Sequence, residues 1–256
     1  PDVGGDRGPY RQSERGAIYD DALRRLARER RLFPCRVSRS ELRELTGSSS
    51  DHGGLPPYPA RLRPTTLEDG WLDDLESRQA RGANDAALRF QVEPGPVAFQ
   101  DAVVGVVLED VAETVGDFVL RRRDGVYAYQ LAVVVDDIAM GVTEVVRGMD
   151  LLDSTARQIQ LIHALEGDVP TYAHLPLAVG ADGEKLAKRH GDTSVRSLRQ
   201  AGVSPAALVG WLAGALGQGD TPRTPLEVAA SFRIEDVRPD PVTVPPDLER
   251  ILLDRS

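Results

Sequence analysis

The chain has 256 residues, of which 41% are hydrophobic and 28% charged, an ordinary composition for a globular protein. Its net charge of −9 argues against a general nucleic-acid coat protein, because nonspecific binding depends on neutralising phosphates. The single cysteine, Cys35, excludes an intramolecular disulfide and indicates a reducing compartment such as the cytoplasm, and the longest apolar run, Ala206–Leu216, is too short to cross a bilayer.

Hydrophobic periodicity predicts two helices, a long loop and two strands in the first part of the chain. Residues 14–32 read as an amphipathic helix with an arginine-rich outer side, and its apolar face carries Ile18, Ala22, Leu26 and Ala27. A short second helix is expected at Ser40–Leu45, capped by Ser38 or Ser40. Residues 47–64 are rich in Ser, Gly and Pro and read as a loop. Strands are predicted at 86–92 and 97–108, with Gly105 as a candidate bulge.

The middle of the chain predicts a parallel α/β layer. Asp124–Gly125 is the strongest short hairpin signal and lies between the segments 117–123 and 126–129. A buried run at 131–137 is followed by a core strand at 141–148, a helix from Asp153 or Ser154 to Leu165, and a strand at 171–179. This order of strand, helix and strand is typical of a parallel sheet. The remaining segments at 194–201, 205–216 and 226–230 are predicted to be helical.

A basic loop directly follows the last predicted strand, in the segment Gly183–Gly191 (G-E-K-L-A-K-R-H-G). On its own the K-x-x-K pattern is a weak signal, because solvated basic loops are common. Open α/β sheets, however, bind their ligands at the carboxyl ends of parallel strands. The position of the loop therefore favours phosphate binding.

Four segments occur in a fixed order along the chain: R-R-R-D-G-V-Y-A-Y-Q-L-A-V-V-V-D-D, G-V-T-E-V-V-R-G-M-D-L-L, H-L-P-L and K-L-A-K-R-H-G. In order and spacing they resemble the second half of the catalytic domain of class I glutamyl-tRNA synthetases, over about residues 12–217. The resemblance implies an α/β fold with a Rossmann-type sheet, a β-containing insertion and a small helical C-terminal region.

The resemblance also implies a glutamate pocket and an ATP pocket. Tyr129 matches the tyrosine that contacts glutamate, and Arg147 matches the arginine that pairs with the side-chain carboxylate, which suits a forked guanidinium. Without these motifs, Tyr129 would be interpreted as an aromatic core residue and Arg147 as a partner in a surface salt bridge. Lys188 matches the ATP-contacting lysine and Lys185 is a secondary candidate, although Ala187 replaces the usual serine between them. Mg²⁺ is the expected counter-ion of the phosphates.

Other polar residues are given structural interpretations. His174 in H-L-P-L is interpreted as structural rather than catalytic. Adjacent carboxylates point in different directions, so packing and capping are favoured over metal binding for Asp136 and Asp137. Arg121–Arg123 and the arginine face of the first helix are weak candidates for tRNA contacts, because hairpin arginines are more often solvated.

The resemblance includes a zinc site that this chain does not reproduce. Relatives with this insertion often bind zinc through Cys-x-Cys, a tyrosine and a further cysteine. Here the corresponding residues are Cys35, Val37, Tyr58 and Leu62. Because a structural zinc needs about four good ligands, no zinc is predicted.

The beginning of the chain also departs from the family. Pro1 stands at the first position, and none of the four histidines (His52, His163, His174 and His190) forms the His-x-Gly-His signature of class I synthetases. We therefore expect the chain to begin within a longer gene product and to lack, on its own, part of the machinery that activates glutamate. Residues 1–33 are then the remainder of the first Rossmann half, 34–120 an acceptor-binding-like insertion, 121–192 the second half with the lysine loop, and 193–256 a helical, stem-contact-like region.

About sixty-five residues follow the lysine loop, too few for the large anticodon-binding domain of full-length glutamyl-tRNA synthetases. That length resembles the short paralogues of the family, which activate glutamate with ATP and transfer it to the queuosine base of tRNA(Asp). The expected partners are glutamate and the anticodon stem-loop of tRNA(Asp), and a monomer without membrane attachment is expected. Two alternatives remain open. They are a fragment of a tRNA(Glu)-charging enzyme, and a degenerate synthetase that binds tRNA or glutamate without the chemistry.

Overall fold

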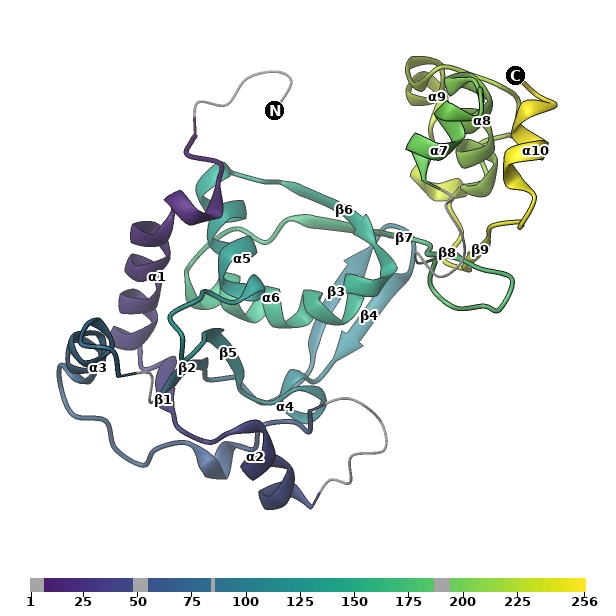
Figure 1. Ribbon diagram of the computed structural model, residues 1–256. Helices are drawn as coiled ribbons and strands as arrows, with labels where there is room; N and C mark the ends of the chain where they lie inside the picture. The colour runs from purple at the N-terminus through teal and green to yellow at the C-terminus, as the bar shows by residue number, and fades with distance from the viewer. Residues whose placement is uncertain (1–6, 48–54, 84–85, 187–193) are drawn as a thin grey trace. The chain divides into compact units, whose positions relative to one another are not determined.

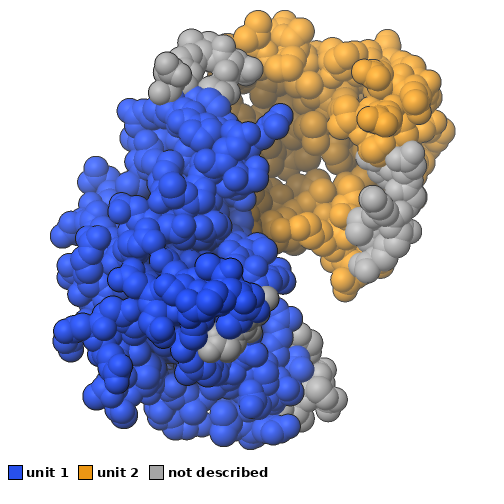
Figure 2. All heavy atoms as spheres, turned by 60° about the vertical axis from the view of Figure 1, so that its left-hand side comes forward, with its two compact units in different colours: residues 1–99, 108–143, 153–170 blue, residues 100–107, 144–152, 171–256 orange. Residues whose placement is uncertain are grey.

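The computed structural model describes residues 7–47, 55–83, 86–186 and 194–256 (Figure 1). The chain divides into two compact units, coloured separately in Figure 2. Unit 1 comprises residues 1–99, 108–143 and 153–170, and unit 2 comprises residues 100–107, 144–152 and 171–256. Of the helices that the structure describes, none has the length and apolarity needed to cross a bilayer.

Unit 1 combines helices with a three-stranded antiparallel sheet of order β1-β2-β5 (Figure 1). The strands are β1 (Leu32–Cys35), β2 (Ala87–Phe90) and β5 (Phe118–Arg121). The helices are α1 (Gly16–Arg28), α2 (Arg39–Thr46), α3 (Trp71–Ala80), α4 (Val111–Thr114), α5 (Tyr129–Met140) and α6 (Leu152–Ala164). Its main core joins α1, α5 and α6 to β2 and β5 through residues such as Leu23, Phe90, Leu120, Leu131 and Leu161.

Helix α1 is shorter than its sequence pattern predicts, and its buried face is rotated. Tyr19, Ala22, Leu23 and Leu26 are buried, whereas the predicted core residue Ile18 is 37% exposed. The buried set follows the i, i+3, i+4, i+7 spacing of a single helical stripe. The helix ends at Arg28 because the next apolar residues, from Leu32 on, form strand β1 and pair with β2.

The second sheet has four strands in the order β4-β3-β7-β6. Strands β6 (Glu144–Gly148) and β7 (Thr171–Leu175) are parallel, and β3 (Val97–Asp101) also runs parallel to β7. This arrangement confirms the predicted parallel layer. The strand predicted at 171–179 is interrupted at Pro176, which has no N–H to donate, and resumes as β8 (Ala178–Val179) beside β9 (Val242–Thr243).

The prediction of one strand over 97–108 is wrong, because a turn divides it into β3 and β4 (Gly105–Glu109). The carboxylate of Asp101 accepts hydrogen bonds from the backbone N–H groups of Val103 and Val104, at 2.9 and 3.0 Å. Such a local bond offers the backbone an alternative to continuing the strand. Gly105 then starts β4 with a φ of +88°, which an L side chain rarely adopts.

The C-terminal part of unit 2 is helical, as predicted. It contains α7 (Val195–Gln200), α8 (Pro205–Ala215) and α9 (Pro225–Ser231), and each is capped by the side chain of the preceding Ser194, Ser204 or Thr224. A further helix, α10 (Leu248–Leu253), was not predicted. Its residues Leu248 and Leu252 complete a small core with Leu198, Val203, Ala207 and Val244.

Candidate active site

Strands β6 and β7 end side by side, and their last residues form the centre of the candidate site. Arg147 is the penultimate residue of β6 and lies in register with His174 of β7. Its Nε donates a hydrogen bond of 3.0 Å to Nε2 of His174, and its Nη2 donates one of 3.2 Å to the carbonyl of Leu151. The guanidinium carbon also lies 5.7 Å from the ring centre of Tyr172. The arginine predicted to read a carboxylate is thus held at the carboxyl edge of parallel strands.

His174 in turn contacts Asp101, a residue to which the sequence assigned no role. Nδ1 of His174 lies 2.6 Å from one carboxylate oxygen of Asp101, and both side chains are fully buried. Burial raises the pKa of Asp101, but hydrogen bonds from the N–H of Val104, the ring of His174 and other donors outweigh it. The net pKa therefore lies below its usual value. Asp101 is accordingly a buried anion held by donors.

Lys185 lies in the same unit, on a tight reversal that follows β8. Its backbone forms an antiparallel bridge with Val179, and Gly183 supplies a φ of +77° at the turn. The Lys185 ammonium pairs with the carboxylate of Asp150, and this hydrogen bond lowers the pKa of Asp150. Both side chains are substantially exposed, so a substrate can compete for the lysine. Lys188 lies outside the described residues.

The glycine of V-V-R-G gives Asp150 its position. A Cβ built on Gly148 would lie 2.7 Å from a carboxylate oxygen of Asp150, closer than real Cβ contacts come. The sequence G-M-D after Arg147 therefore lets the carboxylate fold back toward the strand end. Unit 2 in this way holds Arg147 at the end of β6, and it holds Asp150 and Lys185 in the segments that follow β6 and β8.

Tyr129 belongs to unit 1, where it is the first residue of α5 and is 48% exposed. The predicted hairpin is shorter than expected, since a single bridge joins Arg121 to Tyr127 before the helix begins. The next residue, Gln130, is anchored by hydrogen bonds with Ser154 and Gln158 of α6 at 3.0 and 2.8 Å. An exposed tyrosine beside an anchored first turn fits a ligand-contacting role better than a core role.

The arginines considered for tRNA contacts are largely engaged within the protein. Arg121 is buried and bonds Gln79 at 2.8 Å, and Arg123 donates to the carbonyl of Arg36. On α1, Arg24 pairs with Glu76 and Arg25 with Glu166. Of these, only the exposed pairs could exchange partners with a phosphate at small cost.

Asp136 has the packing role that the sequence predicted. It accepts hydrogen bonds from Nε of the buried Arg15 at 2.5 Å and from the hydroxyl of Tyr19 at 2.9 Å, which tie α5 to α1. Within the described residues, no group of three or more His, Cys, Asp or Glu side chains is placed to hold a metal ion.

The residues at the zinc position of relatives form an apolar cluster. Phe33, Cys35, Leu42 and Tyr58 are buried together, with Val37 and Leu62 packed against them. The thiol of Cys35 donates to the Tyr58 hydroxyl at 3.6 Å, and that hydroxyl donates to the carbonyl of Leu62 at 3.1 Å. One thiol, one phenol and two aliphatic side chains are not a zinc ligand set. The residues present therefore do not fit the metal.

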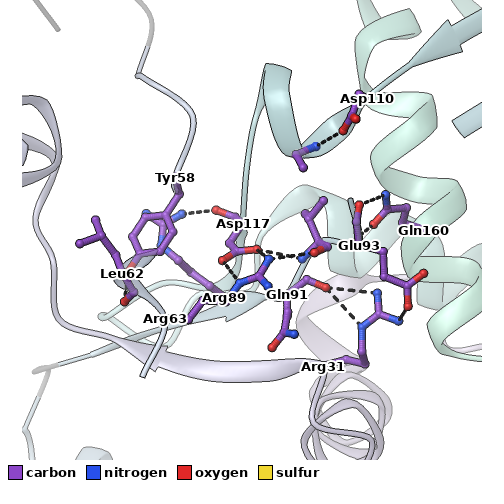
Figure 3. A network of polar contacts seen from close by, with 12 residues as sticks. Arg31, Tyr58, Leu62, Arg63, Arg89, Gln91, Glu93, Asp110, Asp117 and Gln160 are labelled. Atoms are coloured by element: carbon purple, nitrogen blue, oxygen red, sulfur yellow. Dashed lines mark hydrogen bonds and ion pairs between the residues drawn. The ribbon is translucent and has the colours of Figure 1, made fainter. Parts of the chain in front are cut away.

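A buried carboxylate fixes the loop that carries Tyr58 (Figure 3). Asp117 is fully buried and receives two hydrogen bonds of 2.7 Å from Arg63 and one of 2.9 Å from the N–H of Val92. Its own N–H donates to the carbonyl of Tyr58 at 3.2 Å. Arg89 bonds the Asp117 carbonyl at 2.6 Å and lies 4.1 Å over the Tyr58 ring. These polar contacts tie the Tyr58 loop to the residues that follow β2 and precede β5.

Comparisons with known proteins agree with the resemblance. Glutamyl-Q tRNA(Asp) synthetase of Symbiobacterium thermophilum is 46% identical over 250 residues, covering 96% of this chain and 75% of the relative. The protein of the same name from Nitratidesulfovibrio vulgaris is 42% identical, with 97% and 75% covered. Glutamate--tRNA ligase 2 of Nitrosococcus oceani is 41% identical over 217 residues, which cover 83% of this chain but 44% of that relative.

Solved structures show the same fold. A crystal structure of a glutamate tRNA ligase from Elizabethkingia meningosepticum, in complex with its amino acid, superposes with a TM-score of 0.78 at 24% identity and covers 98% of this chain. The chain spans 55% of the length of that protein. The predicted α/β class is therefore confirmed.

The family model for the catalytic domain of class I tRNA synthetases (E and Q) matches residues 2–220. With a match over most of its length and relatives at this identity, the chain belongs to the class I tRNA synthetases of the E and Q type.

Proposed function

We propose that this chain carries part of an active site that activates glutamate with ATP and transfers it to the queuosine base of tRNA(Asp). The observation that carries the proposal is the carboxyl edge of β6 and β7, where Arg147 is fixed and Lys185 follows in the same unit. The relatives named glutamyl-Q tRNA(Asp) synthetase support it, because they are 46% and 42% identical to this chain, whereas the glutamate--tRNA ligases of Syntrophus aciditrophicus and Nitrosococcus oceani are 37% and 41% identical.

In the first step, an oxygen of the glutamate α-carboxylate attacks the α-phosphorus of ATP. The bond to the β-phosphate breaks and pyrophosphate leaves, so negative charge develops on the phosphates. Lysines of the loop, Lys185 and by resemblance Lys188, are suited to stabilise that charge as it forms. In the second step the acyl group passes to the tRNA nucleoside and AMP leaves. Mg²⁺, when bound with ATP, neutralises part of the phosphate charge.

Arg147 and Tyr129 are proposed to select glutamate. A guanidinium pairs with a carboxylate through two parallel hydrogen bonds, whereas the amide of glutamine offers a donor where an acceptor is needed. The Tyr129 hydroxyl can both donate to and accept from the amino acid. Residues 34–120 are proposed to be the insertion of this domain. We also propose a monomeric cytoplasmic protein, consistent with the single buried cysteine.

The residues at the zinc position support a protein that functions without zinc. Its insertion is held by the Asp117 network and the apolar cluster around Tyr58. ATP, with its Mg²⁺, is then the only group besides glutamate and tRNA that the proposal requires.

Glutamate-dependent exchange of pyrophosphate into ATP tests the first step, in the protein as its gene encodes it, with any sequence that flanks this chain. Transfer of labelled glutamate to tRNA(Asp) with queuosine, tRNA(Asp) without it, and tRNA(Glu) tests the second. We expect exchange without tRNA and labelling of the queuosine-containing tRNA(Asp) alone. Labelling of tRNA(Glu) would instead identify a tRNA(Glu)-charging enzyme. Binding of tRNA without exchange would identify a non-catalytic module.

A further inference from the structure

Three side chains form a continuous hydrogen-bonded chain across the sheet of unit 2, from β3 through β7 to β6. The strand register pairs Arg147 with His174, and Asp101 with Tyr172. Residues in register, and residues two apart on one strand, point to the same face of a sheet. Asp101, His174 and Arg147 therefore share one face, although 73 and 27 residues separate the successive partners along the sequence.

The chemistry of arginine fixes the direction of every bond in this chain. A guanidinium has only donors, so Nε2 of His174 must accept from Nε of Arg147 across 3.0 Å. The hydrogen of the neutral ring then lies on Nδ1 and is donated to Asp101 across 2.6 Å. The second oxygen of Asp101 accepts from three backbone N–H groups, those of Val103, Val104 and His174. Hydrogen bonds to both of its oxygens thus hold the Asp101 carboxylate in one orientation, and this carboxylate selects the His174 tautomer that carries its hydrogen on Nδ1.

Stability alone does not account for this arrangement. Both Asp101 and His174 are fully buried, and a buried carboxylate has to be desolvated before its hydrogen bonds repay that cost. Apolar side chains of similar volume usually fill such a layer without that penalty. The position of these hydrogen bonds is informative, because they lead to Arg147, the arginine of β6 that the proposed function assigns to glutamate.

We infer that Asp101 and His174 are positioning residues that fix the plane of the Arg147 guanidinium and thereby set the selectivity for glutamate over glutamine. The inference rests on the proposed function. A guanidinium held at Nε presents its fork in one orientation, which matches a carboxylate and opposes an amide donor. A guanidinium free to rotate would bind glutamate less well and would avoid the clash with glutamine. Loss of the anchor should therefore weaken binding and selectivity together.

The test uses two substitutions that separate the two bonds of His174. In His174→Gln, an amide oxygen can replace Nε2 as the acceptor that faces Arg147. In His174→Asn, the shorter amide can reach Asp101 but leaves Arg147 without that acceptor. Asp101→Asn removes the anchoring charge. His163→Asn and Asp168→Asn, at exposed positions of unit 1, are matched controls. Each is assayed by pyrophosphate exchange in the protein as its gene encodes it.

We expect the KM for glutamate to rise about tenfold or more in His174→Asn and in Asp101→Asn, as for loss of a charge-assisted hydrogen bond. The ratio of kcat/KM for glutamate over glutamine should fall, while the KM for ATP stays within about twofold. His174→Gln should retain more of the selectivity than His174→Asn, and the controls should match the wild type. If the Asn variants fold and keep the glutamate KM and selectivity of the wild type while Arg147→Ala loses activity, that result would overturn the inference and leave the proposed function standing. Absence of exchange in the wild type would instead overturn the proposed function.

One measurement needs no variant and decides the case even if the substitutions prevent folding. The ¹⁵N chemical shifts of the His174 ring distinguish a hydrogen on Nδ1 from one on Nε2 in the wild-type protein. We expect the hydrogen on Nδ1, since Nε2 faces a donor. A hydrogen on Nε2 would be incompatible with the bond to Arg147 and would refute the positioning role.

Discussion

The thiol of Cys35 and the hydroxyl of Tyr58 are hydrogen-bonded to each other, at 3.6 Å, inside an apolar cluster. The resemblance implies zinc ligands at four positions, of which two are Cys35 and Tyr58. The other two positions hold Val37 and Leu62 here, and neither side chain can bind zinc. Burial, together with the hydrogen bond to Cys35, raises the pKa of Tyr58 and keeps the phenol neutral. The cluster is thus stabilised by packing, and the buried Cys35 thiol is part of it.

We therefore predict that the purified protein contains far less than one equivalent of zinc and that excess EDTA leaves its melting temperature unchanged. Metal content can be measured by mass spectrometry after chelator-free purification. A structural zinc contributes folding free energy directly, so its removal would lower the melting temperature. One bound equivalent together with destabilisation by EDTA would contradict the prediction.

Asp117 is predicted to be a major contributor to the stability of unit 1. Asp117→Ala removes the acceptor of two hydrogen bonds from Arg63 and leaves the N–H of Val92 unpaired. Breaking a buried ion pair typically costs about 3–5 kcal/mol, and the partial exposure of Arg63 places the expected loss near 3 kcal/mol. Urea unfolding measures it. The exposed pair Arg122–Asp124 gives the control, because Asp124→Ala should cost less than about 1 kcal/mol.

Gly116 is predicted to tolerate no side chain. A Cβ at this position would lie 2.1 Å from the carbonyl oxygen of Tyr58, and the backbone has a φ of +67°. Gly125 offers a control, since its φ is +81° but a Cβ there meets nothing within 4 Å. We expect Gly125→Ala to cost about 1 kcal/mol for the conformation alone. Gly116→Ala should cost at least about 2 kcal/mol more, because the Tyr58 loop must also move. Equal losses in urea unfolding would show that the contact is unimportant.

The parallel layer could be predicted from the sequence because apolar strand segments and a helical segment alternate over residues 141–179, although α6 begins at Leu152, ahead of both predicted caps. The short elements could not. Helix α10 has six residues, and its burial depends on partners in α8 and the 244 region that no local pattern reveals. The sequence predicts β3 and β4 as one strand because both segments are rich in apolar residues. The turn between them begins at Asp101, whose side chain accepts the hydrogen bond from the N–H of Val103.

The site was predicted only to the extent that motifs mark it. Arg147 and Lys185 are proposed as site residues because V-V-R-G and K-L-A-K belong to an ordered series. Asp101 has no such mark, because its partner His174 lies 73 residues away and is placed by strand register. The proximity of an aspartate at a strand end to a buried histidine is a tertiary fact, and no spacing rule in the sequence expresses it.

Lys185 is predicted to act on ATP with little effect on stability. Its pair with Asp150 is exposed, and such pairs are typically worth less than about 1 kcal/mol. Lys185→Ala should therefore leave the melting temperature within a few degrees while lowering kcat/KM for ATP about tenfold or more in pyrophosphate exchange. Asp150→Asn keeps the ammonium and should lose less. An equal loss in both variants would indicate that the ion pair itself, rather than the cation, is required.

The last prediction concerns acid stability and Asp101. Its pKa in the folded protein lies below the usual value, since the hydrogen bonds from Val104, His174 and other donors outweigh the effect of burial. A carboxyl group with a depressed pKa stabilises the fold above its unfolded pKa of about 3.9, and this contribution is lost as the pH falls through the folded pKa. Asp101→Asn should thus be less stable than the wild type by a constant amount between about pH 7 and pH 5. The gap should close below about pH 4, as the wild-type carboxyl also becomes neutral.

Urea unfolding of both proteins across this range measures the difference, and Asp168→Asn, at an exposed position, should show a small gap throughout. A gap that widens on acidification would mean that the folded protein favours the protonated acid, and Asp101 would then not be an anionic anchor that orients His174 and Arg147.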